Sequence, residues 1–286
     1  MRPGPRLSRR FRPAGEDAFR ARSIRGTRYF RSRQRHEDLT IIVERFPGSD
    51  AVPADGGLPR SYVLVHGIGV SSRYFRPLAV ELAKTGAVYL VDLPGYGAAP
   101  NPRRDVTLAD HAAVLATFLR KTDLVNPVIV GHSMGTQIVS LLAAKHPDVT
   151  DRIVVMAPTM EPVARTPGRA IGRLLHDATR EPPVVFWIAV TDYLIRCGLP
   201  YLLRQMPHML NDRIEERVGT NHAKTLVING DRDTISTTPW ARELGRTDER
   251  TAFREVHGPH VIMHTDPVMI ARHITDFVGS PDRSSE

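Results

Sequence analysis

The sequence predicts an α/β fold in which a mostly parallel sheet is flanked by helices and carries an insertion. Short apolar runs at residues 62–65, 128–130 and 225–228 have the length and β-branched character of buried parallel strands. After the second run, apolar residues recur at helical spacing up to about residue 145. At 286 residues, the chain has the size of one such domain with an insertion.

The motif GHSMG at residues 131–135 places Ser133 between the apolar run 128–130 and a helix with Ile138 and Leu142 on one face. A strand that enters a helix through G-x-S-x-G makes a sharp turn, and the glycines leave room for its tight backbone. The serine hydroxyl is then exposed at the carboxyl edge of the sheet, where the free N–H groups of the helix N-terminus point towards a developing oxyanion. The pattern therefore predicts Ser133 as a catalytic nucleophile.

Two later strands supply candidates for a base and an acid, which a serine needs because its hydroxyl is a poor nucleophile near neutral pH. The run 225–228 ends in a loop that carries Asp231 and Asp233, and a further run at 253–256 leads to two of the candidate histidines. The carboxyl ends of parallel strands meet at one crevice. We therefore expect an acid and a histidine from these loops to approach Ser133.

The loop after the first strand is the fourth part of the predicted site. His66-Gly67-Ile68-Gly69 follows the run 62–65, and its glycines allow the backbone to lie close to a substrate carbonyl. The backbone N–H groups of Ile68 and Met134 are the predicted oxyanion hole.

Together, these stretches resemble the α/β-hydrolase fold superfamily, in its lid-bearing esterase and lipase-like branch. The resemblance spans roughly residues 60–280 and keeps the family's order. It rests on the HGIG loop at 66–69, VDLPGYG at 91–97, GHSMG at 131–135, GDRD at 230–233, and His260 with Pro267 seven residues beyond it.

The resemblance implies the catalytic triad Ser133, Asp233 and His260. The family places its acid three residues after the glycine that ends the strand, which selects Asp233 over Asp231. The spacing from histidine to proline selects His260 over His257 and His264. The family often has an acidic residue five positions after the histidine, where this chain has Thr265. That departure affects local capping and leaves the chemistry intact.

Other polar residues near these loops receive structural roles from the same resemblance. Asp92 lies at a strand end and is expected to brace its turn, while His66 and His132 are expected to pack and hydrogen-bond their loops. The remaining histidines show no metal-ligand spacing, and no cofactor or metal motif is found. We therefore expect neither a cofactor nor a metal.

The region between the two halves of the predicted core is rich in apolar helices. The resemblance implies a core at residues 36–159 and 223–280 and a helical lid at 160–222. Part of the lid's apolar load is expected to line an acyl pocket. Phe186 and Trp187 are the predicted substrate-binding residues.

The positive charge of the chain is concentrated at its start. Residues 1–35 contain 12 Arg against Glu16 and Asp17, and the rest of the chain has a net charge of −2. This composition predicts a tail that is mostly disordered until about Arg28. A solvated tail is the simplest interpretation, and contact with an anionic surface is the alternative, with no specific nucleic acid binding expected.

Cysteine usage and hydropathy bear on the compartment. Cys197 is the only cysteine, so no internal disulfide can form, which fits a reducing cytosol. Residues 8–11, SRRF, resemble a twin-arginine signal, but no apolar segment follows. No run of 18 apolar residues occurs. The expected location is the cytoplasm, including peripheral contact with a membrane surface.

The sequence as a whole predicts a serine hydrolase that cleaves carboxylic esters, with acyl groups of medium length, through an acyl-enzyme. Two alternatives use the same triad, namely a C–C bond hydrolase of ring-cleavage products and a cofactor-free perhydrolase. A third is a non-catalytic ligand-binding protein on a hydrolase scaffold. A fourth makes the basic tail primary, with the body tethered to a membrane or a nucleic acid.

Overall fold

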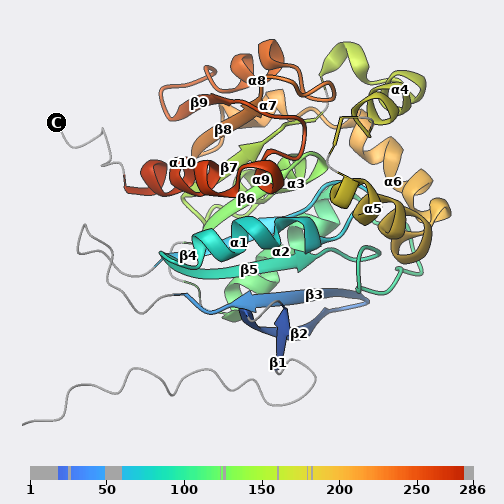
Figure 1. The fold of residues 1–286 in the computed structure, drawn as a ribbon, viewed down its shortest axis with the longest axis vertical. Coiled ribbons are helices and arrows are strands. Elements are labelled where there is room, and N and C mark those ends of the chain that lie inside the picture. The colour runs from blue at the N-terminus through green and yellow to red at the C-terminus, as the bar shows by residue number, and fades with distance from the viewer. Residues whose placement is uncertain are drawn as a thin grey trace, which may run out of the picture.

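The fold is built on one central sheet. The computed structural model describes residues 19–24, 27–48, 60–122, 124, 127–159, 161–178, 180–181 and 183–279. Within this part of the chain, nine strands form the order β1-β2-β3-β5-β4-β6-β7-β8-β9 (Figure 1). The strands are β1 (Arg20–Ile24), β2 (Thr27–His36), β3 (Leu39–Phe46), β4 (Arg60–Val65), β5 (Gly86–Asp92), β6 (Val128–His132), β7 (Arg152–Met156), β8 (Lys224–Gly230) and β9 (Thr251–Val256).

Most of the sheet is parallel, as the sequence predicts. The strands from β4 to β9 pair in parallel, with β4 between β5 and β6. The β1–β2–β3 meander is antiparallel and joins the sheet where β3 pairs with β5. Because parallel strands end at the same edge, the loops after β4, β6, β8 and β9 lie on one side of the molecule. The predicted fold class is confirmed.

Helices cover both faces of the sheet because successive strand residues point in opposite directions. Val63 and Val65 of β4 share a core with residues of α2 and α3, whereas Tyr62 and Leu64 share the opposite core with residues of α1 and α10. The helices of the core domain are η1 (Ser72–Phe75), α1 (Arg76–Leu82), α2 (Leu108–Thr122), α3 (Met134–Lys145), α8 (Thr238–Leu244), α9 (Ile262–Thr265) and α10 (Pro267–Gly279).

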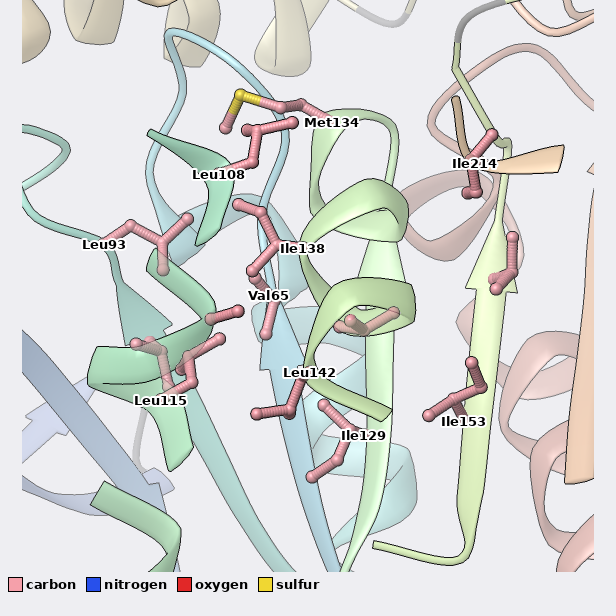
Figure 2. Close-up of a cluster of buried hydrophobic side chains, with 14 of the residues drawn as sticks. Val65, Leu93, Leu108, Leu115, Ile129, Met134, Ile138, Leu142, Ile153 and Ile214 are labelled. Carbon is pink, nitrogen blue, oxygen red and sulfur yellow. The ribbon is translucent and has the colours of Figure 1, made fainter. Parts of the chain in front are cut away.

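Helix α3 is held against the sheet by the apolar face that the sequence predicts. Figure 2 shows Ile138 and Leu142 of α3 packed beside Val65 of β4 and Ile129 of β6, and all four side chains are buried. Burying a Leu or Ile side chain contributes about 1.5–3 kcal/mol. This packing fixes the N-terminal end of α3, and with it Met134, at the carboxyl edge of the sheet.

The first strands correct the boundary of the predicted tail. Strand β1 and all of β2 except His36 lie inside residues 1–35, although the sequence analysis expected disorder until about Arg28 and a tail extending to residue 35. Tyr29 of β2 is buried and stacks on Phe46 of β3 at 5.5 Å between ring centroids. The composition argument fails here because the arginines of β2 can remain in water on one face of the strand while alternate residues pack on the other. Residues 1–18 lie outside the described residues.

A helical segment, residues 161–218, connects β7 to β8. It contains η2 (Pro162–Ala164), α4 (Pro167–Ala178), α5 (Pro183–Thr191), η3 (Asp192–Cys197), α6 (Leu199–Asn211) and α7 (Glu215–Val218). These elements fall inside the predicted lid range 160–222, and the function of the segment as a lid stays a prediction. Among the described residues, no helix combines the length and the apolar composition needed to cross a membrane.

Candidate active site

Ser133 occupies a strained turn between β6 and α3. Its φ of 55° and ψ of −125° lie outside the regions that L residues usually adopt. Such a conformation costs about 1–3 kcal/mol and persists only where the surroundings enforce it. A Cβ atom on Gly131 would collide with the carbonyl of Gly135, and one on Gly135 would collide with the carbonyl of Val65. Both glycines of the motif are therefore required by close backbone contacts, which hold the turn in this form.

The acid and the histidine selected by the family resemblance lie together. The loops after β8 and β9 bring Asp233 Oδ2 within 2.7 Å of His260 Nδ1, and both residues are buried. Asp233 Oδ1 accepts hydrogen bonds from the backbone N–H groups of Ile235 and Ser236, each at 2.8 Å. The carboxylate is thereby fixed, and its other oxygen is directed to the imidazole.

The rival acid and histidine also pair, at the surface. Asp231 Oδ2 lies 2.9 Å from His257 Nδ1, and Asp231 Oδ1 accepts the Gly258 N–H at 3.0 Å. The His257 side chain is 71% exposed, against 9% for the His260 side chain. The chain thus contains two Asp–His pairs of similar geometry, of which one is buried. His264 contacts the carbonyl oxygen of Tyr74 through Nδ1 at 3.2 Å, away from both pairs.

Ser133 and His260 sit on adjoining loops. His132, the neighbour of Ser133, has its ring centroid 4.6 Å from that of His260, and its Nε2 lies 3.0 Å from the His260 carbonyl oxygen. Among the described residues, no hydrogen bond joins the Ser133 hydroxyl to the His260 ring. Such bonds are often long in the absence of substrate and shorten in the reacting complex.

A hydrogen-bond relay links three of the loops around Ser133. The His260 carbonyl only accepts, so His132 Nε2 carries the proton and His132 Nδ1 accepts from the Tyr74 hydroxyl at 2.9 Å. The Tyr74 oxygen in turn accepts the Gly67 N–H at 3.0 Å. Burial lowers the pKa of His132 well below its usual value, which keeps it in the neutral form that the relay needs. Sequence reasoning missed Tyr74, because no motif marks it.

The segments that carry the two predicted oxyanion donors adjoin Ser133. A Cβ atom on Gly67 would lie 2.9 Å from the Ser133 Cβ atom, so the loop after β4 touches the nucleophile. Ile68 follows Gly67 directly, and Met134 is the first residue of α3. The first N–H groups of a helix have no intrahelical partner and are available to an anion.

His66 and Asp92, the residues expected to stabilise their loops, accept hydrogen bonds from backbone N–H groups. His66 Nε2 accepts the N–H of Leu93 at 3.1 Å, and so joins the loop after β4 to the loop after β5. Asp92 accepts the N–H groups of Ser72 at 2.8 Å and Ala98 at 2.9 Å.

The helical segment binds the loop after β4 through a buried carboxylate. Asp192, fully buried, accepts from the Ser71 N–H at 2.8 Å, from the Ser71 hydroxyl at 2.6 Å and from Arg73 Nη2 at 2.6 Å. The ring of Tyr193 fills the space beside Gly69, where a side chain would collide with it. Sequence reasoning missed Asp192, since its partners lie about 120 positions away in the chain.

Three carboxyl groups surround the His260 ring. Burial alone would lower the pKa of His260, but the charge and hydrogen bond of Asp233, assisted by Asp177 and Glu181, raise it to about 9. Burial and the charge of Asp177 raise the pKa of Glu181 to about 8. Glu181 Oε1 accepts the Val261 N–H at 3.0 Å, which places this carboxyl next to the histidine loop. The electrostatic environment of the histidine is therefore acidic.

The predicted substrate-binding residues lie at the surface. Phe186 is 41% exposed and Trp187 is 63% exposed, and their rings meet edge to face. Their contact with substrate stays a prediction. Among the described residues, no group of three or more His, Cys, Asp or Glu side chains has an arrangement suited to a metal ion.

Comparison with known proteins identifies the family of this fold. A family model described as the alpha/beta hydrolase fold matches residues 63–278. An sn-1-specific diacylglycerol lipase of Mus musculus is 37% identical over 123 residues, which cover 42% of this chain and 39% of the relative. A pimeloyl-[acyl-carrier protein] methyl ester esterase of Chromobacterium violaceum is 36% identical over 96 residues, covering 33% of this chain and 35% of the relative.

Solved structures match over a larger part of the chain. The enol-lactonase from Burkholderia xenovorans LB400 superimposes with a TM-score of 0.73 at 18% identity, and the match covers 87% of this chain and all of that one. The chain spans a smaller part of the curated relatives. The match covers 39% of the lipase, 35% of the esterase and 28% of an uncharacterized protein of Mycobacterium bovis.

Proposed function

Because the chain belongs to the alpha/beta hydrolase fold family, we propose that it is a serine hydrolase that cleaves carboxylic esters through an acyl-enzyme on Ser133, Asp233 and His260. The observation that carries this proposal is the buried 2.7 Å contact between Asp233 and His260, on loops that adjoin the strained turn at Ser133. A nucleophile, a base and an orienting acid are the groups that the reaction requires.

The proposed reaction has two steps. His260 removes the Ser133 proton as the hydroxyl attacks the ester carbonyl, and Asp233 holds the imidazole in the tautomer whose Nε2 accepts that proton. The Ile68 and Met134 N–H groups stabilise the tetrahedral oxyanion, each contributing about 3 kcal/mol to transition-state stabilisation. His260 then protonates the leaving alcohol. A water molecule, activated by the same histidine, hydrolyses the acyl-enzyme.

The proposed substrates are uncharged esters with acyl groups of medium length or lipid-like character. The names of the relatives include a lipase and an esterase, which favour ester chemistry for this chain. The acidic surroundings of His260 also favour a neutral substrate, since an anionic group near Asp233 or Asp177 would be repelled.

The acidic surroundings of His260 also disfavour the C–C bond hydrolase alternative. A C–C bond hydrolase of ring-cleavage products binds carboxylates, and an arginine in the site would favour it. Four arginines of the helical segment are candidates for that role. Arg173 pairs with Glu161 at 2.8 Å and Arg196 with Asp192 at 3.4 Å, whereas Arg180 and Arg204 are exposed. Perhydrolase chemistry and non-catalytic ligand binding remain as outcomes of the experiment below.

The experiment measures hydrolysis of p-nitrophenyl esters from acetate to palmitate. We expect an optimum at medium chain length, loss of turnover in Ser133→Ala, and large losses in Asp233→Asn and His260→Gln. The second Asp–His pair supplies matched controls, because Asp231→Asn and His257→Gln alter a similar contact outside the site. No turnover at any chain length in folded protein would overturn the ester proposal. Equal losses in both pairs would overturn the assignment of the triad.

A further inference from the structure

Helix α5 combines an apolar sequence with a solvent-exposed position. Its nine residues, Pro183–Thr191, include no charged side chain. Val185 is buried, but Val184 is 59% exposed and Trp187 is 63% exposed. A helix that is apolar around its whole circumference is normally buried in a large core or in a membrane. Within the described residues, the fold covers α5 on one side only.

Helices α4 and α6, which precede and follow α5 in the chain, also expose apolar residues. Ile171 and Leu175 of α4 are four positions apart, and both are exposed. Leu199 and Leu203 of α6 have the same spacing and are also exposed. Residues at this spacing share one face of a helix. Figure 1 shows α4, α5 and α6 gathered at one side of the molecule. We call the exposed apolar side chains of these three helices the apolar face.

The exposed charges within residues 161–211, which contain the three helices, have one sign. Among the described residues of 161–211, no carboxylate side chain is exposed, because the four acidic residues of this stretch are buried or half-buried. Arg169, Arg180 and Arg204 are exposed, and no ion pair is recorded for them in the described part of the chain. The exposed charged side chains that these three helices and their connections contribute are therefore cationic.

We propose that the apolar face docks on the surface of a bilayer that contains anionic phospholipids. Aromatic and aliphatic side chains of a surface helix enter the boundary between headgroups and acyl chains, and flanking arginines attract anionic headgroups. A second copy of the chain is a less suitable occupant, since two faces bordered by unpaired arginines would repel each other. This proposal is independent of the chemistry at Ser133.

Docking in this orientation would place the candidate site near the lipid. Helix α5 continues into η3, whose Asp192 binds the loop after β4 through Ser71 and Arg73. The helices on the membrane are therefore joined directly to the loop that carries Ile68, and lipid-like esters would have a short path to the site.

The two tryptophans of the chain allow a direct test. Trp240 is 4% exposed and donates its Nε1–H to the Pro158 carbonyl, whereas Trp187 is on the apolar face. The full chain is mixed with vesicles of phosphatidylcholine and phosphatidylglycerol whose acyl chains are brominated. We expect bromine to quench the fluorescence of Trp187, and we expect weaker binding to pure phosphatidylcholine or at high salt.

Vesicle sedimentation compares matched variants. Phe186→Ala/Trp187→Ala should lower the partition coefficient by at least about a hundredfold, because two large apolar side chains no longer enter the lipid. Val268→Ala/Met269→Ala is the control, because these residues of α10 are exposed and apolar but lie outside the apolar face. Circular dichroism verifies that both variants are folded. Replacing Arg169, Arg180 and Arg204 with Gln should abolish the preference for anionic vesicles.

Three results would overturn the proposal. The first is vesicle binding without quenching by brominated chains, which would assign the contact to another surface such as the arginine-rich start of the chain. The second is equal binding of the two double variants. The third is a lipid-independent dimer, detected by sedimentation velocity and lost in Phe186→Ala/Trp187→Ala, without vesicle binding. That result would assign the apolar face to a second copy.

Discussion

Removing the carboxylate of Asp192 tests whether the helical segment supports the oxyanion loop. The Asp192 side chain is fully buried and accepts three hydrogen bonds from Ser71 and Arg73, at 2.6 to 2.8 Å. Breaking a buried ion pair by deleting one partner costs about 3–5 kcal/mol, because the remaining charge is left without compensation. The Arg73 side chain is 25% exposed and can recover some hydration, so we expect a value near the lower end of that range.

The assay combines urea denaturation with ester hydrolysis. Asp192→Ala should lower the free energy of unfolding by about 3 kcal/mol. It should also lower kcat by about tenfold to a hundredfold, with a small change in KM, because a displaced Ile68 N–H would weaken an interaction made in the transition state. Asp192→Asn, which retains an acceptor, should recover part of both losses.

A second variant of the same cluster serves as the control. Arg196 Nε lies 3.4 Å from Asp192 Oδ1, and its side chain is 35% exposed. Arg196→Gln should therefore cost less than about 1 kcal/mol. The reasoning is refuted if Asp192→Ala is as mild as Arg196→Gln. A destabilised Asp192→Ala with unchanged kcat would refute the link to the oxyanion loop.

Three further predictions follow from the site and from the first strands. The pKa of His260 is raised to about 9, and a general base must be neutral to accept a proton, so kcat/KM should increase with pH and level off above about pH 9. Asp233→Asn should move this rise to lower pH and reduce the maximal kcat/KM. A wild-type plateau that is already reached by pH 6 would contradict the assignment. Tyr74→Phe removes the hydroxyl of the relay, and we expect a loss in kcat of about tenfold with little change in KM, which steady-state kinetics can verify. Deleting residues 1–18 should leave turnover of a soluble ester and the melting temperature unchanged, whereas deleting residues 1–35 should lower the melting temperature, because it removes β1 and most of β2 from the sheet.

The parts of the fold that could be predicted are those specified by neighbouring residues. Apolar β-branched runs indicated β4, β6 and β8, and the motif around Ser133 indicated the turn between β6 and α3. The need for glycine at both positions of that motif can be predicted from the motif alone, because any such turn brings backbone atoms close to Gly131 and Gly135. Local patterns of this kind carry the fold class and the order of the site loops.

The parts that were missed depend on contacts between distant residues. Asp192 reads as one polar residue in an apolar stretch, and its role appears only when the helical segment lies against Ser71. Tyr74 reads as a core aromatic, and only the fold places its hydroxyl between Gly67 and His132. Strand β2 was hidden by its arginines, since composition does not distinguish a solvated tail from a strand with one packed face.

The measurement that tests the central claim most directly is covalent labelling with a fluorophosphonate, read by intact mass and by peptide mapping. Ser133 should be the labelled residue if it is the nucleophile activated by His260. We predict one adduct on the peptide that contains Ser133, no adduct in Ser133→Ala, and slow labelling in His260→Gln but not in His257→Gln. An adduct on another residue, or no adduct in folded wild-type protein, would contradict the account.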